Sequence, residues 1–203
     1  MLAQLRSALA ALPDALTALV FLAAWIAPLH WGRELVGNLM LVMLLEFLVV
    51  HSGGFIGQVV LSPAVSRAAK TGAVVGFGAF YLIFVLAFAL AFHRPWAIAA
   101  FSWQLCGKLV TVWLSPVPVE REAQRQKLLW GVSVALYLGG VFATSLLPLP
   151  RLGLQPDVVA QLGLPGKGLW VERPHTVIAF GALYFGALAA LKWRSALGME
   201  AQA

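Results

Sequence analysis

Six predominantly apolar segments, each about 20 residues long, recur along this chain and constrain its fold more than any other feature. About 20 apolar residues are what a helix needs to cross the hydrocarbon core of a bilayer. A helix also satisfies its own backbone hydrogen bonds, which hydrocarbon cannot do for it. We therefore predict an all-α, polytopic integral membrane protein with a single transmembrane domain over residues 1–203. The predicted spans are about 13–29, 34–52, 71–92, 95–115, 128–147 and 175–193.

The composition excludes several classes of protein. Hydrophobic residues make up 61% of the chain and charged residues 11%, against roughly 45–50% and about 25% in soluble domains. So few charges cannot cover the surface of a water-soluble enzyme, and a chain this apolar is neither disordered nor a nucleic-acid module. The net charge of +6 comes from basic residues at the ends of the apolar segments, where they act as topology signals. The predicted partner is thus the lipid bilayer, with no nucleic acid.

The distribution of Lys and Arg predicts the orientation of the spans. With a cytoplasmic N-terminus, eight basic residues lie inside and five lie outside. Three of the outer five fall in one long loop, 148–174, and long loops count less in the positive-inside rule. We expect both termini in the cytoplasm, with the protein in a bacterial inner membrane.

The outer loop 148–174 contains a further helix signal. Pro156 and Asp157 suit a helix start, Gly163 suits its end, and Val158, Val159 and Leu162 lie between them. We expect a short amphipathic helix that lies on the outer membrane surface or folds over the mouth of the bundle.

Two charged residues fall deep inside predicted spans. Glu46 lies 12 residues after Glu34, and Lys108 lies 13 residues after Pro95. Both therefore lie roughly 18–20 Å below the outer boundary at 1.5 Å per residue. Equal depth predicts an ion pair between them, and such groups in membranes are candidates for function. The alternative is that the pair only fixes helix register, or that Lys108 reaches the nearby interface.

Two spans carry polar residues at helical spacing. Such faces turn toward other helices or a wet cavity, so the two faces are expected to meet and to form a polar interior for water, an ion or a small ligand. The face of the fourth span consists of Gln104, Lys108, Thr111 and Ser115, and that of the fifth of Ser133, Tyr137, Gly140 and Thr144.

His51 precedes the pair Gly53-Gly54, which interrupts the second apolar segment. The segment is interpreted either as one long kinked helix or as a helix followed by a short interfacial turn. The His51 ring is expected to hydrogen-bond backbone groups freed by the kink. A proton relay from Glu46 through His51 is the alternative hypothesis.

Three other histidines, His30, His93 and His175, fall at the outer ends of predicted spans. With a carboxylate from Glu34 or Glu172, they could form a zinc or copper site. Because no HExxH or HxxxH spacing is present, the alternative is that they are polar anchors at the interface. The lone Cys106 excludes an internal disulfide framework.

Three hypotheses of function follow from these features. The first is a small membrane protein whose polar interior handles or transports a proton, an ion or a small ligand. The second is a non-catalytic structural or assembly subunit with a membrane-complex partner or a second copy of itself. The third is a metal-dependent membrane enzyme that uses the outer histidines. The sequence assigns no cofactor.

Overall fold

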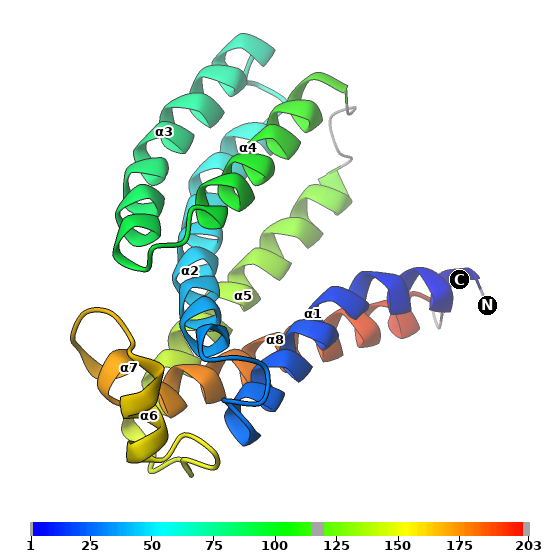
Figure 1. Cartoon of the computed structure of the whole chain (residues 1–203). Coiled ribbons are helices and arrows are strands. Elements are labelled where there is room, and N and C mark those ends of the chain that lie inside the picture. Colours follow the sequence, from blue (N-terminus) through cyan, green and yellow to red (C-terminus); the bar gives the residue numbers. More distant parts are fainter. Residues whose placement is uncertain (1, 115–119, 201–203) are drawn as a thin grey trace. The chain divides into compact units, whose positions relative to one another are not determined.

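The computed structural model describes residues 2–114 and 120–200 of the chain, with side chains described over 8–114, 123–124 and 126–194. The protein is all-helical, with 82% of residues in helices and no strand among the described residues. The helices are drawn in Figure 1. They are α1 (Leu2–Ile26), α2 (Glu34–Leu61), α3 (Arg67–Ala91), α4 (Trp96–Leu114), α5 (Glu120–Leu146), α6 (Pro156–Leu162), α7 (Leu169–Glu172) and α8 (Pro174–Glu200).

Six helices in the described part of the chain are long and apolar enough to cross a membrane, which confirms the predicted class. Their candidate spans are Ala8–Ile26, Glu34–Leu61, Arg67–Ala91, Trp96–Leu114, Gln126–Leu146 and Pro174–Arg194. The last residue of the predicted fourth span, at position 115, lies outside the described residues.

The chain divides into two compact units, and the single transmembrane domain stays a prediction. Unit 1 consists of Met1–Met40 and Leu136–Ala203, and unit 2 is Leu41–Ala135. The boundaries fall inside α2 and α5, so each of these helices contributes one part to each unit.

The first helix differs from its prediction at both ends. It begins at Leu2 rather than near Pro13, which lies inside the helix. The carbonyl oxygen of Pro13 accepts a hydrogen bond from the Thr17 hydroxyl at 2.8 Å. The helix ends at Ile26 because Pro28 disfavours the helical conformation at the residue before it.

The second helix is continuous through Gly53 and Gly54 and ends at Leu61, nine residues beyond the predicted end. The two glycines therefore do not end the helix. A Cβ added to Gly54 would lie 2.5 Å from the Trp130 ring, and one added to Gly53 would lie 3.5 Å from it. These glycines leave room for the Trp130 ring of α5 to pack against α2 within unit 2.

Unit 1 is built on the pairing of α1 with α8, which lie side by side (Figure 1). Phe21 of α1 and Phe180 of α8 are both fully buried. The Phe21 ring lies where a Cβ on Gly181 would be, at 2.2 Å, so the absence of a side chain at Gly181 sets the close approach.

The predicted amphipathic helix of the outer loop is present as α6. Pro156 occupies its first turn, and Gly163 ends it in the left-handed conformation with φ of 59°, which favours glycine. The loop is tied to the end of α1, because the Gly153 amide donates to the Trp25 carbonyl and the Trp25 indole donates to the Pro150 carbonyl.

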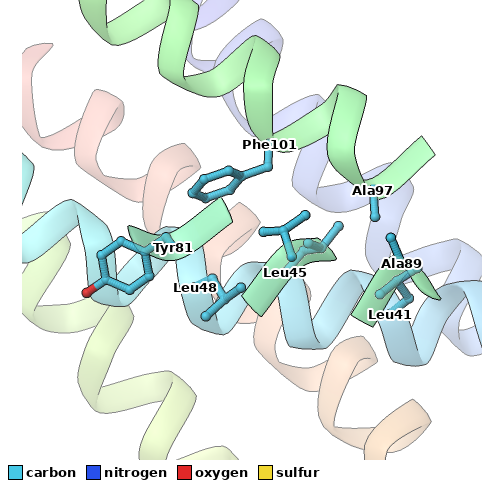
Figure 2. Close-up of a cluster of buried hydrophobic side chains, with 8 residues drawn as sticks. Leu41, Leu45, Leu48, Tyr81, Ala89, Ala97 and Phe101 are labelled. Carbon is cyan, nitrogen blue, oxygen red and sulfur yellow. The ribbon is translucent and has the colours of Figure 1, made fainter. Parts of the chain in front are cut away.

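Unit 2 contains an apolar cluster shared by α2, α3 and α4 (Figure 2). It consists of Leu41, Leu45, Leu48, Tyr81, Val85, Ala89, Ala97 and Phe101. A second cluster of Ile56, Val74 and Val112 extends the contact toward the other end of the same helices.

Candidate functional site

Unit 2 contains a pocket with a volume of about 200 Å³ among α2, α4 and α5. Its walls come from the last turns of α2, from Lys108 of α4 and from the first turns of the membrane-spanning part of α5. The described lining residues are Gly53, Gly54, Gly57, Gln58, Leu61, Lys108, Gln126, Lys127 and Trp130.

Trp130 holds one wall of this pocket in place. Its indole N–H donates to the backbone carbonyl of Val50 at 2.8 Å. Its ring lies against Gly54, where the helix has no side chain. The hydrogen bond satisfies the polar indole nitrogen, and the ring contact joins α5 to α2 beside the pocket.

The electrostatics of the pocket are cationic. Lys108 is half-buried and Lys127 is exposed, and Gln58 and Gln126 add side-chain amides. The described lining residues include no Asp or Glu. Two ammonium groups without a carboxylate between them favour an anion and disfavour a cation.

The register of α2 against α4 separates Glu46 from Lys108. Leu41 and Ala97 share one apolar cluster, and Ile56 and Val112 share the other. Lys108 lines the pocket with Gly53, Gly54 and Gln58 of α2, and Glu46 is not among its described lining residues. Gly53 is seven residues after Glu46, roughly 10 Å along the helix.

The predicted equal depth therefore does not follow from this register. The prediction of equal depth counted residues from the predicted start of each helix. It therefore assumed that α2 and α4 begin at the same level. Glu46 is half-buried on α2 and Lys108 lines the pocket, and their ion pair stays a prediction that this register does not favour.

The remaining polar residues of α4 do not share the surroundings of Lys108. Gln104 and Thr111 are exposed, and neither is among the described lining residues of the pocket. The Thr111 hydroxyl donates to the Gly107 carbonyl of its own helix at 2.9 Å. Ser115 lies outside the described residues.

The predicted meeting of the polar faces of α4 and α5 stays a prediction for the second half of α5, which belongs to a different unit from α4. Tyr137 and Gly140 belong to unit 1 and pack against α8. Tyr137 is buried, with its ring edge-on to Phe180 at 4.9 Å and to Tyr184 at 5.5 Å. An aromatic ring fits into aromatic surroundings better than into a polar cavity.

The hydroxyl groups of α5 also bond locally. Ser133 donates to the Leu129 carbonyl and Thr144 donates to the Gly140 carbonyl. These are bonds within one helix and do not contribute to a polar interior.

His51 has a partner that the sequence did not predict. Its Nδ1 lies 2.7 Å from the Tyr81 hydroxyl on α3. The expected bond to backbone groups freed at Gly53-Gly54 is wrong, because α2 continues through the glycines. Close to these glycines in the chain, the Val50 carbonyl accepts a hydrogen bond from the indole N–H of Trp130.

The three histidines that the sequence places at the ends of spans lie at or next to helix ends. His30 is exposed and its ring lies edge-on to Trp31, whereas His175 is buried near the start of α8. His93 is exposed just after α3, in unit 2. Among the residues that the structure describes, no group of three or more His, Cys, Asp or Glu could hold a metal ion.

Several residues of the site and of unit 1 were missed from the sequence. They are Lys127, Trp130 and Asp14, none of which was singled out from the sequence. Asp14 forms an ion pair with Lys192 between α1 and α8. Helical spacing could not reveal the Trp130–Val50 and Asp14–Lys192 contacts, because they join residues 80 and 178 positions apart.

Comparison with protein-family models, with curated proteins and with solved structures found no match.

Proposed function

We propose that this protein binds a small anionic ligand at the membrane interface, in the pocket that contains Lys108. The observation that carries the proposal is the pairing of two lysines and two glutamines around a cavity of about 200 Å³ whose described lining has no carboxylate. The sequence predicted a site for an ion or a small ligand at Lys108, and the proposal specifies that this ligand is an anion.

The position of Lys108 supports the proposal. A lysine inside a membrane span is costly unless it is paired, reaches the interface or lines a polar cavity. Lys108 is six residues before the end of α4, about 9 Å from it. At this depth its ammonium group can meet a ligand whose charged part remains near the headgroup region.

The charges of nearby segments support the cytoplasmic side for this pocket. The pocket is built from the end of α2 and the first turns of the span in α5. The first turns of α3, which follows α2, and of α5 carry Arg67, Lys70, Arg121 and Arg125 in the sequence. We propose a bacterial inner membrane with both termini cytoplasmic, in accordance with the positive-inside rule.

The test is binding by the purified protein in detergent, measured by titration calorimetry. The probes are inorganic phosphate and dihexanoyl phosphatidic acid, with dihexanoyl phosphatidylcholine as the zwitterionic control. We expect at least one anionic probe to bind and the control to bind at least tenfold more weakly. Lys108→Met should weaken anion binding about tenfold, because it removes one of two cationic partners.

Lys167→Met is the matched control, because it removes an exposed lysine from unit 1. It should leave the affinity unchanged. If Lys108→Met does not fold, two other variants provide the comparison. Lys127→Met removes a positive charge from the pocket, and Lys108→Arg keeps one there. Equal binding of anionic and zwitterionic probes, or no loss in either lysine-to-methionine variant, would overturn the proposal and favour a structural subunit.

A further inference from the structure

A second feature of unit 2 lies on α2 and α3, and none of its rings is among the described lining residues of the lysine pocket. Five rings form a continuous series that we call the His51 aromatic face: Phe47, His51, Phe55, Phe77 and Tyr81. The His51 ring is stacked on Phe47, with centroids 5.6 Å apart and planes 15° apart. Phe55 stacks on Phe77 at 5.7 Å. Phe47, His51, Phe55 and Phe77 are all exposed.

Tyr81 determines which nitrogen of His51 carries the proton. The Tyr81 hydroxyl lies 2.7 Å from Nδ1, and its oxygen points away from the apolar cluster (Figure 2). Tyr81 is only 4% exposed, and among the described residues its hydroxyl has no second hydrogen-bond partner. If Nδ1 donated to the hydroxyl, the buried O–H would have no acceptor. The hydroxyl therefore donates to Nδ1, and the proton of the neutral ring is on Nε2.

The Nε2–H group then faces outward without a protein acceptor. Within the described part of the chain, His51 has Tyr81 as its sole hydrogen-bond partner. The midpoint of α2 lies between Phe47 and Leu48, so His51 is about 5 Å from it along the axis. A helix of 28 residues is longer than the hydrocarbon core of about 30 Å, and His51 falls within that core. Lipid chains cannot accept a hydrogen bond there.

We propose that the His51 aromatic face binds a lipid-soluble planar ring compound that carries a carbonyl oxygen, of the quinone type. The carbonyl accepts the hydrogen bond from Nε2, and the ring packs on the exposed faces of Phe47 and Phe55. The depth of the site requires a ligand that is soluble in hydrocarbon, and the flat aromatic rings favour a flat partner. This inference is independent of the proposed anion site, which lies on α2, α4 and α5.

The proposal concerns binding and includes no transfer of electrons. The probe is decylubiquinone, titrated into the protein in lipid nanodiscs, with decylbenzene as the probe that lacks the carbonyl oxygens. We expect saturable binding of the quinone, and binding of decylbenzene at least tenfold weaker.

The variants separate the hydrogen bond from the shape of the site. His51→Phe keeps a ring but removes the donor, and it should weaken quinone binding at least tenfold. His51→Gln keeps an N–H donor and should bind within about threefold of the natural protein. His30→Phe, a change in an exposed histidine of unit 1, and Lys108→Met should both leave quinone binding unchanged.

A Tyr81→Phe variant provides a second measurement that does not depend on folding of the His51 variants. It removes the group that holds the proton on Nε2, and we expect a loss of several-fold in quinone affinity. Equal binding of the two probes, or equal binding by His51→Phe, would overturn the proposal. So would a dimer that dissociates in His51→Phe, because a second copy would then cover this face.

Discussion

At the scale of single residues, glycines and aromatic rings form complementary contacts across helix pairs. Gly54 lies against Trp130, Gly140 against Phe180 and Gly181 against Phe21. In each pair a ring occupies the space that a methyl group would fill. Lipid provides no hydrophobic force between helices, so close packing of this kind holds them together.

Gly140 and its neighbour Gly139 allow a matched test of this packing. A Cβ on Gly140 would lie 2.5 Å from the Phe180 ring, whereas one on Gly139 has nothing within 4 Å. Phe180 is fully buried and cannot move aside cheaply. Gly140→Ala should therefore destabilise the protein by about 1–3 kcal/mol.

Thermal unfolding followed by size-exclusion chromatography in detergent measures the effect. Gly140→Ala should lower the Tm by roughly 3–9 °C. Gly139→Ala should leave it unchanged or raise it slightly, because alanine is the better helix former. Equal Tm values for the two variants would contradict the assigned contact.

At the scale of elements, the pairing of α1 with α8 includes an ion pair between membrane spans. Asp14 is 13% exposed and Lys192 is 42% exposed. The carboxylate is therefore the more desolvated partner. Loss of the lysine leaves a largely buried charge, and loss of the carboxylate leaves an ammonium group that still reaches water.

A double-mutant cycle with Asp14→Asn and Lys192→Met measures the pair. We expect each single change to destabilise the protein, with Lys192→Met the more harmful. The double variant should be more stable than the sum of the two predicts, with a coupling energy of about 1 kcal/mol. Additive effects in the cycle would show that the two side chains do not interact.

At the scale of the whole molecule, six crossings determine which loops share a side of the membrane. The loop between α2 and α3 and the loop after α5 are separated by three crossings, those of α3, α4 and α5. Six spans therefore predict that these loops face opposite sides.

Cysteine labelling tests this topology. Cys106 is the single native cysteine, so a Cys106→Ala protein provides the background. Ala64→Cys, between α2 and α3, and Lys167→Cys, between α6 and α7, both place the thiol at exposed positions.

In intact cells a membrane-impermeant maleimide should label Lys167→Cys, and it should label Ala64→Cys only after permeabilisation. The reverse pattern would keep six spans but overturn the cytoplasmic termini. Labelling of both positions from one side would contradict the number of spans.

Local patterns in the sequence predicted the parts of the fold that depend on neighbouring residues. The apolar segments identified the six spans, and Pro156 with Gly163 identified α6, because helix formation and helix ends respond to residues within a few turns. The ends of α1 and α2 were missed for a related reason. Pro13 and Gly53-Gly54 are local breakers that nevertheless lie inside continuous helices, and at Gly53-Gly54 the Trp130 ring of α5 packs against the helix.

The sequence by itself determined that this protein is helical, spans a membrane and carries charge inside two of its spans, since composition and periodicity are properties of the chain. Only the tertiary structure decided which side chains meet. It placed Lys108 beside Lys127 in a pocket, His51 beside Tyr81 and Asp14 beside Lys192. The physical reason is that the register between two helices depends on which glycine of one helix each aromatic ring of the other packs against.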